Sequence, residues 1–399
     1  MKAKKKLLFV NESLTLAGGE KSLIALLSNL DQKYDIDLQL FRYGGALDVF
    51  IPDYVNILPP LDYTEFANKS WKENLMNVLR GKNFQFFKSK LSYSFNLRKG
   101  TYNHQEKAQL YWEAVRGCFL TPGKEYDVAI AYAQGVPTFY VMDIINAKRK
   151  ITWLNAKPNF PSENKVFQKG YYERYDAIVP VSEITHEQIK ELFPDLDSKF
   201  KTLVDIVDYR SIVKMADMEN VNFKRDTFNI LTVARLNYKS KRFDIALEAC
   251  KILKEKKVSF HWYVLGEGDY RPQMEQYIIK HALENYFTLL GTTVNPYPYY
   301  KAADLYVQTS ELESYGISIA EARLLNLPVV TTQFDTVYMQ MVHEKNGLVT
   351  DLNAEAVAEA IVRLMTDKEL YNSIVEYLKE EQKENLETVA LFDQLINTI

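Results

Sequence analysis

Residues 305–321 read LYVQTSELESYGISIAE, a stretch that passes from a strand pattern to a helix pattern within a short distance. The run Leu305–Gln308 carries the apolar and aromatic side chains of a short buried strand. A strand that leads through a polar loop into a helix is the repeating unit of a parallel α/β sheet. Because ligands of such sheets bind just beyond the carboxyl ends of the strands, this loop is a candidate binding site.

The start of the following helix is a candidate anion site. We expect the helix to begin near Ser314, whose hydroxyl would cap it. The backbone N–H groups of Tyr315, Gly316 and Ile317 would then lack helical acceptors. Gly316 has no side chain to keep a diphosphate away from these donors, and the helix dipole adds positive partial charge. The stretch is therefore suited to bind a diphosphate.

A glutamate stands on each side of this helix start. Glu321 shares a helical face with the apolar Ile317 and Leu325, so its carboxylate is expected to be buried and to need a donor. The hydroxyls of a ribose could supply the hydrogen bonds, and so could a protein Arg or Lys. Glu313 could accept hydrogen bonds from a transferred hexose, although taken alone it is more typical of a solvated loop acid.

A second cluster, ARLNYKSKRFD at residues 234–244, places four cations directly after the strand pattern Asn229–Ala234. Arg235 offers a planar fork and Lys241 a point charge. These are the two usual ways of neutralising a leaving diphosphate without a metal ion. Solvated surface charge is the alternative explanation.

Two glycine pairs follow other strands. Gly18 and Gly19 lie between the strand Leu7–Val10 and a helix with a leucine-rich face, where they let a ligand approach the backbone. Gly266 belongs to a Gly-Glu-Gly sequence after the strand Phe260–Leu265. Neither pair forms a GxGxxG fingerprint, so each pair alone is weak evidence for a ligand-binding site.

The whole chain alternates short β-rich runs with amphipathic helical stretches, which predicts an α/β fold with parallel sheets. A polar stretch at residues 214–226 indicates a boundary between an acceptor-side domain, 1–213, and a nucleotide-binding domain, 214–384. The remaining predicted strands are Ile36–Phe41, Val55–Leu58, Val128–Ala131, Ile151–Leu154, Ala177–Val181, Phe287–Leu290, Val329–Thr332 and Leu348–Thr350.

Composition excludes several classes of protein. The net charge of -3 gives no basic field for nucleic acid. Cys118 and Cys250 are the only cysteines and none of the five histidines has a telling neighbour, so neither a metal site nor a disulfide framework is expected. Since no apolar stretch approaches the roughly 18 residues of a spanning helix, we expect a cytoplasmic protein, with the inner face of the plasma membrane as an additional location.

An insertion at about residues 64–118 interrupts the first domain. Glu73 is the only acidic residue between Asn68 and Lys99, whereas this stretch contains many basic residues interleaved with aromatic ones. Such a segment could lie on an anionic membrane or receive an acidic, lipid-linked acceptor. Alternatively its aromatic side chains pack on the domain and its lysines are merely solvated. The basic residues are Lys69, Lys72, Arg80, Lys82, Lys88, Lys90, Arg98 and Lys99.

The second half closely resembles the retaining glycosyltransferases of family four, whose GT-B architecture has two Rossmann-like domains facing a cleft. The resemblance rests on the Glu-x7-Glu motif of Glu313 and Glu321 and on the stretches NILTVARLNYKSKRFDIALEA, WYVLGEGDYRPQME, LLGTTVNPYPYYKAADLYVQTS, EARLLNLPVVTT and KNGLVTD. In the first half, AGGEKSLIALLSNL, YDVAIAY and KITWLN are similar to members of bacterial cell-wall and polysaccharide branches.

The resemblance assigns a role to each candidate residue. Glu313 with the backbone at 315–317 would hold the donor hexose, Glu321 the ribose, and Arg235 with Lys241 the diphosphate, while Lys239 could substitute for Lys241. Asn155 stands on the acceptor side where many relatives have histidine, and Asp205 where asparagine is common. The full set of implied donor-binding residues is Gly18, Gly19, Arg235, Lys239, Lys241, Gly266, Thr292, Glu313, Ser314, Tyr315, Gly316, Ile317 and Glu321.

The implied function is transfer of a hexose, with retained anomeric configuration, from a UDP-sugar to a cell-surface glycan, glycolipid, teichoic-acid or protein acceptor. The resemblance implies no metal or other cofactor. It also implies that the leaving phosphate itself helps to deprotonate the acceptor from the same face, so that no protein nucleophile is needed. A C-terminal helix at about 385–399 is expected to pack back on the first domain. The substitution at Asn155 leaves open a second hypothesis, a catalytically inactive GT-B-like accessory subunit that binds a partner transferase or acceptor.

Overall fold

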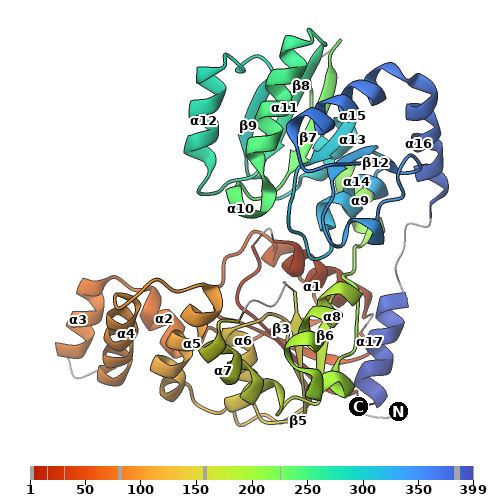
Figure 1. The fold of residues 1–399 in the computed structure, drawn as a ribbon. Coiled ribbons are helices and arrows are strands. Elements are labelled where there is room, and N and C mark those ends of the chain that lie inside the picture. Colours follow the sequence, from red (N-terminus) through yellow and green to blue (C-terminus); the bar gives the residue numbers. More distant parts are fainter. Residues whose placement is uncertain are drawn as a thin grey trace. The chain divides into compact units, whose positions relative to one another are not determined.

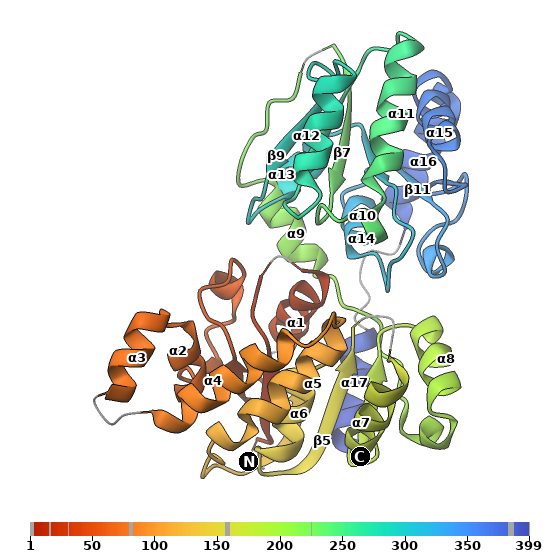
Figure 2. The same ribbon diagram turned by 60° about the vertical axis from the view of Figure 1, so that its left-hand side comes forward.

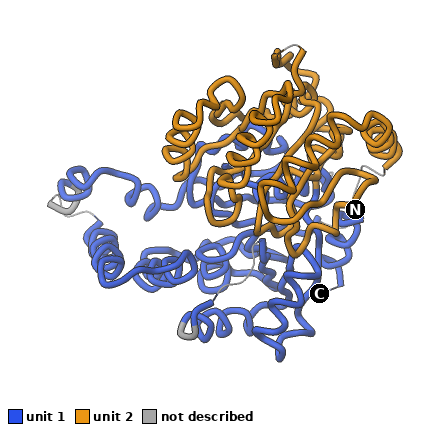
Figure 3. Tube along the Cα trace, turned by 45° about the horizontal axis from the view of Figure 1, so that its top comes forward, with its two compact units in different colours: residues 1–206, 386–399 blue, residues 207–385 orange. Residues whose placement is uncertain are grey.

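The chain forms two compact units, seen in a computed structural model that describes residues 4–15, 17–30, 32–79, 83–155, 160–224, 226–381 and 387–398. Unit 1 comprises residues 1–206 and 386–399, and unit 2 comprises residues 207–385 (Figure 3). Unit 2 thus begins at Val207 rather than at residue 214. The physical reason is that Ile212 and Ala216, on helix α9 (Tyr209–Ala216), are buried in the core of unit 2.

Unit 1 is a doubly wound parallel sheet with the strand order β3-β2-β1-β4-β5-β6 (Figure 1). Its strands are β1 (Lys6–Asn11), β2 (Asp35–Leu40), β3 (Val55–Ile57), β4 (Tyr126–Ala131), β5 (Ala147–Leu154) and β6 (Ala177–Pro180). The α-helices outside the insertion are α1 (Gly18–Asn29), α6 (Val136–Asp143), α7 (Ser162–Tyr172), α8 (Glu183–Leu192) and α17 (Glu387–Thr398), and the short 3-10 turns are Asp48–Phe50, Arg116–Cys118 and Pro194–Lys199.

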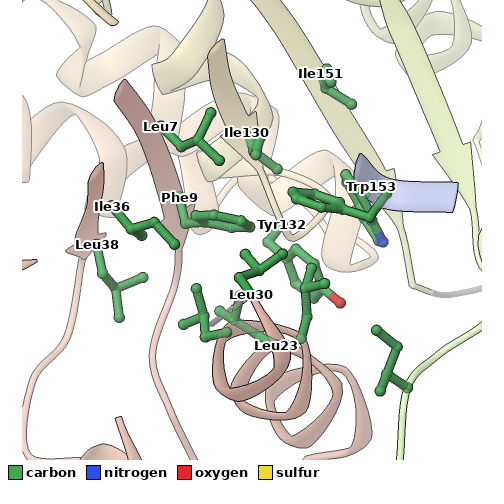
Figure 4. Close-up of a cluster of buried hydrophobic side chains, with 14 of the residues drawn as sticks. Leu7, Phe9, Leu23, Leu30, Ile36, Leu38, Ile130, Tyr132, Ile151 and Trp153 are labelled. Carbon is green, nitrogen blue, oxygen red and sulfur yellow. The ribbon is translucent and has the colours of Figure 1, made fainter. Parts of the chain in front are cut away.

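The core of unit 1 lies between the sheet and helix α1. Leu23 and Leu30 of α1 point at side chains from β1, β2, β4 and β5, among them Phe9 and Trp153 (Figure 4). Helix α17 covers the same face, where the ring of Phe392 lies 6.0 Å from that of Phe9 and 6.2 Å from that of Trp153. The last helix of the chain is therefore part of unit 1.

Four helices between β3 and β4 form the insertion. They are α2 (Asp62–Asn68), α3 (Trp71–Leu79), α4 (Phe84–Leu97) and α5 (His104–Val115). Both views of the ribbon show them as a helical extension beside the sheet of unit 1 (Figures 1 and 2). Trp112 of α5 is fully buried and anchors the extension, because its indole N–H donates to Asp143 Oδ2 at 2.9 Å.

Unit 2 repeats the topology of unit 1, with the strand order β12-β11-β10-β7-β8-β9 and all strands parallel. The strands are β7 (Phe228–Val233), β8 (Phe260–Leu265), β9 (Phe287–Gly291), β10 (Leu305–Gln308), β11 (Val329–Thr332) and β12 (Gly347–Thr350). The helices are α9, α10 (Tyr238–Lys241), α11 (Phe243–Glu255), α12 (Arg271–Lys280), α13 (Tyr297–Ala302), α14 (Ile317–Leu324), α15 (Ala354–Thr366) and α16 (Lys368–Glu380), with a 3-10 turn at Val337–Met339.

The prediction of two Rossmann-like parallel-sheet domains is confirmed, and every predicted strand is present with its ends shifted by a few residues at most. In each unit the strand order reverses between two adjacent strands, β1 and β4 in unit 1 and β7 and β10 in unit 2. Ligands of such sheets bind where the order reverses, beyond the carboxyl ends of those strands. The loops after β7 and β10 are therefore the expected site in unit 2.

Within the described ranges, no helix combines the length and the apolar composition that crossing a membrane requires.

Candidate functional site

The loops that follow β7 and β10 are joined by hydrogen bonds. The backbone N–H of Glu311 donates to the carbonyl of Ser240 at 2.9 Å, and Thr309 Oγ1 donates to the carbonyl of Lys241 at 3.0 Å. Asn237 caps the short helix α10 by accepting from the N–H of Ser240 at 3.1 Å, which fixes the direction of the loop. The cationic loop and the Glu313 loop are thereby one structural unit.

Lys241 and Glu313 form an ion pair at the centre of this unit. Lys241 Nζ donates to Glu313 Oε1, and the two side chains are only 21% and 12% exposed. The same carboxylate oxygen accepts from Gln308 Nε2 at 2.6 Å and from Ser310 Oγ at 2.8 Å. The alternative explanation of Glu313 as a solvated loop acid is therefore wrong.

The second carboxylate oxygen of Glu313 is different. All the hydrogen bonds to this side chain go to Oε1, and no donor in the part of the chain that the structure describes bonds to Oε2. The carboxylate is held rigidly by three donors on one side while its other oxygen keeps its acceptor capacity. Such an oxygen can accept a hydrogen bond from a ligand hydroxyl.

The helix after Glu313 begins later than expected. Helix α14 starts at Ile317, with Gly316 as its N-cap in the left-handed conformation (φ 84°), so the expectation of a start near Ser314 with a serine cap is wrong. Glycine adopts this conformation without the strain that a side chain would impose. The N–H groups that lack an acceptor within the helix are accordingly those of Ile317 and Ser318, because the N–H of Ile319 already donates to the carbonyl of Gly316.

Residues distant in the sequence fix the loop before α14. Gln340 Nε2 donates to the carbonyls of Tyr315 and Gly316, and Thr336 Oγ1 donates to the carbonyl of Glu313 at 3.1 Å. These bonds hold the segment in a bent conformation up to Gly316. Tyr315 therefore lies outside the helix and not in its first turn.

Glu321 is completely buried, as its helical face predicts, and two of its donors are tyrosine hydroxyls. Oε1 accepts from the hydroxyl of Tyr297 at 3.0 Å and Oε2 from the hydroxyl of Tyr300 at 3.1 Å. Burial, and then the charge of Glu321, raises the pKa of both phenols well above its usual value, so both remain donors. The sequence signal for this pair was YPYY at 297–300, with two tyrosines one helical turn apart.

The other cations of the loop lie at the surface. Arg235 and Lys239 are both exposed, whereas Lys241 is the lysine beside Glu313. Arg242 is neutralised by Asp244 and Glu311, at 2.9 and 2.8 Å. The geometry thus favours Lys241 over Lys239 as the cation of the site.

Gly266 and Gly268 have a structural role that the sequence did not reveal. A Cβ on Gly266 would lie 1.9 Å from the carbonyl oxygen of Ala234, and one on Gly268 would lie 2.2 Å from that of Leu236. Both glycines let the turn after β8 pack directly on the backbone of the cationic loop. Thr292, the remaining candidate in unit 2, is exposed just after β9.

In unit 1 the structure brings Gly19 and Asn155 together. Gly18 and Gly19 are the first two residues of α1, and a Cβ on Gly19 would lie 3.0 Å from Asn155 Nδ2. Asn155 Nδ2 donates to the carbonyl of Tyr132 at 2.6 Å, while its buried Oδ1 accepts no hydrogen bond from any described residue. The glycine therefore makes room for the amide of Asn155.

A buried polar group behind this contact was not singled out as a site. Ser22 Oγ lies 3.1 Å from the hydroxyl of Tyr132 and accepts from the N–H of Ile206 at 3.1 Å. Asp205 is 5% exposed beside them. Burial raises the pKa of Asp205 to about 6, against the opposing effect of a hydrogen bond from Ser22.

Among the described residues no three His, Cys, Asp or Glu side chains come together as a set of metal ligands.

The two doubly wound sheets, with polar clusters beyond strand ends, define a protein of the GT-B class. Residues 213–381 match the family described as Glycosyl transferases group 1. The chain shares 31% identity over 144 residues with the amylovoran biosynthesis glycosyltransferase AmsK of Erwinia amylovora, covering 34% of this chain and 35% of that one.

Other relatives are more distant. The poly(glycerol-phosphate) alpha-glucosyltransferase of Bacillus subtilis is 24% identical over 267 residues, covering 65% of this chain and 37% of that protein. The crystal structure of Anabaena HepE in complex with UDP-glucose has a TM-score of 0.69 at 17% identity, covering 98% of this chain and 99% of that one, which shows a shared fold. The chain spans between 35% and 61% of the length of the first curated relatives.

Proposed function

We propose that the protein is a retaining glycosyltransferase that transfers a hexose from a UDP-sugar to a cell-surface acceptor. The observation that carries the proposal is Glu313. Its carboxylate is anchored through Oε1 by Lys241, Gln308 and Ser310, and its Oε2 is left to accept from a sugar hydroxyl just before a helix start. The match of residues 213–381 to the group 1 family supports the same reaction class.

The diphosphate of the donor would bind between Lys241 and the start of α14. A lysine ammonium has three N–H donors, and Glu313 takes one of them, so two can reach phosphate oxygens. The N–H groups of Ile317 and Ser318 and the dipole of α14 add further favourable interactions. Arg235, exposed on the joined loop, would supply the bidentate contact.

The ribose would bind to Glu321. A carboxylate offers about four acceptor positions, and the ribose hydroxyls would join or displace the donors that Glu321 already has, which include the hydroxyls of Tyr297 and Tyr300. Because Glu321 is fully buried, ribose binding requires the side chains that cover it to move. We infer a uridine nucleotide, and the structure of HepE, which was determined with UDP-glucose, supports that choice of donor.

The reaction would proceed on one face of the sugar. The acceptor hydroxyl attacks the anomeric carbon as the bond from that carbon to the β-phosphate oxygen breaks, and its proton passes to the leaving phosphate. Lys241 and Arg235 would stabilise the negative charge that develops on the diphosphate, so the proposal needs neither a metal ion nor a protein nucleophile.

The acceptor class is a cell-surface glycan, glycolipid, teichoic acid or protein. The relative from Bacillus subtilis is named for a poly(glycerol-phosphate) acceptor and that from Erwinia amylovora for amylovoran biosynthesis, which supports a polymer of the cell surface. We place the reaction at the cytoplasmic side, where nucleotide sugars are made.

Calorimetric titration of the full chain with UDP-, GDP- and ADP-sugars, each with and without EDTA, tests the donor. We expect one UDP-sugar to bind with an affinity that EDTA does not change, and to be slowly hydrolysed or transferred. A protein that binds none of the nucleotide sugars and hydrolyses none would instead be the inactive accessory subunit. Analysis of the anomeric configuration of the product by NMR tests retention.

A further inference from the structure

Helix α4 of the insertion has one face that packs against the rest of unit 1. The ring of Phe86 lies edge-on to Tyr63 at 5.4 Å, and that of Tyr93 lies edge-on to Tyr111 at 5.2 Å. On the same side, Lys90 Nζ donates to the carbonyl of Ala67 at 2.8 Å. Packing on helices α2 and α5 therefore accounts for this half of the helix.

The opposite face of α4 is not explained by packing. Phe84, Leu91 and Phe95 are 68%, 45% and 64% exposed, and Lys88 between them is also exposed. These residues follow one another at steps of three or four, so they form a single stripe along the helix. Lys99 extends the stripe, since its Nζ lies 4.8 Å from the centre of the Phe95 ring.

Helix α3 lies beside α4 (Figure 2), where the ring of Trp71 is 5.8 Å from that of Phe87. It carries further exposed apolar side chains. Trp71, Leu75 and Met76 are about half exposed, at 49%, 49% and 51%. A group of neighbouring large apolar side chains that are exposed to solvent marks an interaction site, whereas single exposed apolar residues are common on protein surfaces.

The charge of this surface is one-sided. Glu73 is the only acid between Asn68 and Lys99. The described basic side chains that are exposed there are Lys69, Lys72, Lys88, Arg98 and Lys99. The excess of positive charge on this surface favours a partner that carries negative charge.

The geometry points to docking of the α3–α4 surface on an anionic lipid bilayer. A soluble polyanion would need the cations alone and would leave Phe84, Leu91 and Phe95 in water. A bilayer can bind both kinds of side chain. The apolar side chains enter the boundary between headgroups and acyl chains, while the lysines bind the acidic headgroups. This inference concerns unit 1 and does not depend on the chemistry proposed for unit 2.

Flotation of the full chain with lipid vesicles tests the inference. We expect binding to phosphatidylcholine vesicles that contain phosphatidylglycerol, weakened at high salt, and about tenfold less binding to phosphatidylcholine alone. The double variant Phe84→Ser/Phe95→Ser should lower binding about tenfold, and Lys88→Gln roughly fivefold. Ile279→Ser is the matched control, because Ile279 is 68% exposed on helix α12 of unit 2; it should bind as the unchanged protein does.

Three results would overturn the inference: equal binding to both kinds of vesicle, binding that the phenylalanine variant leaves unchanged, or binding only to a soluble polyphosphate. Circular dichroism melting checks that the double variant is folded. If it is not, Lys88→Gln and the salt dependence of the unchanged protein still decide the question. Hydrolysis of the donor in solution, which the double variant should retain, separates this test from that of the proposed transfer.

Discussion

Replacing Asp205 with asparagine should stabilise unit 1 at neutral pH. The side chain is 5% exposed, and burial raises the pKa of its carboxyl from 3.8 to about 6. The fold therefore favours the protonated form. Protonated Asp205 contributes its full stabilisation of the fold at a pH below 3.8, the pKa of the carboxyl in the unfolded chain. This contribution is lost as the pH rises through about 6, its pKa in the folded protein.

The magnitude follows from the shift. A difference between 3.8 and about 6, at about 1.4 kcal/mol for each pH unit, makes ionised Asp205 cost about 3 kcal/mol of folding free energy at pH 7.5. Asparagine has nearly the same shape and carries no charge, and the hydroxyls of Ser22 and Tyr132 can accept from its amide. For a unit of this size, Asp205→Asn should raise the melting temperature by about 5–10 °C at pH 7.5.

Differential scanning calorimetry at pH 7.5 and pH 4.5 is the assay, with attention to the transition of unit 1. The gain should be largest at the higher pH and should shrink at the lower one, where Asp205 is mostly protonated. Asp53→Asn, at an exposed position of the same unit, is the control and should change little at either pH. A gain of equal size at both pH values, or a loss at pH 7.5, would refute the reasoning.

Three further predictions concern unit 2. Lys241→Ala should lower kcat of transfer about 100-fold or more, and more than Lys239→Ala does, because only Lys241 lies beside Glu313. Gly316→Ala should weaken binding of UDP and lower stability by about 1–2 kcal/mol, since alanine is strained at a φ of 84°; calorimetry and melting measure the two effects. Glu321→Ala should weaken binding of UDP by about 1–3 kcal/mol and also destabilise unit 2 in urea denaturation, because it removes the carboxylate that accepts from two buried tyrosine hydroxyls.

The strands could be predicted because parallel sheets buried on both faces leave continuous apolar runs in the sequence. Leu305–Gln308 and Val329–Thr332 were found with the bounds that the structure has. The boundary at residue 214 was misplaced because a polar stretch was taken for the linker. Helix α9 before it is amphipathic, and only its packing shows which unit it joins.

The start of α14 could not be predicted from local preference. Serine is a better N-cap than glycine by intrinsic preference, which favoured Ser314. The structure overrides this preference through Thr336 and Gln340, which bond to the carbonyls of residues 313, 315 and 316. Contacts that span more than twenty residues leave no trace in a local pattern.

Glu321 also shows what a local sequence pattern can and cannot predict. The helical face of Glu321 correctly predicted its burial, because periodicity reports which side of a helix meets the core. Two of its donors come from Tyr297 and Tyr300, 24 and 21 residues earlier in the chain. Periodicity says that a buried carboxylate needs a donor but not which residue supplies it.

The insertion combines both sequence interpretations. Phe86 and Tyr93 pack on the neighbouring insertion helices α2 and α5, whereas Phe84 and Phe95 on the other face of α4 are exposed. Composition alone could not separate the two sets, because both contribute to the same count of aromatic residues.

The pairing of Lys241 with Glu313 links the stability of the site to its proposed use. A half-buried cation without a partner is costly, so a site that must receive a diphosphate needs something to neutralise its lysine while it is empty. Glu313 does this through Oε1 and keeps Oε2 for a ligand. If a diphosphate binds as proposed, Lys241 would gain a second anionic partner without losing the first. The loss caused by removing either residue therefore mixes a binding effect with the cost of the partner left behind, and only a double-mutant cycle separates the two.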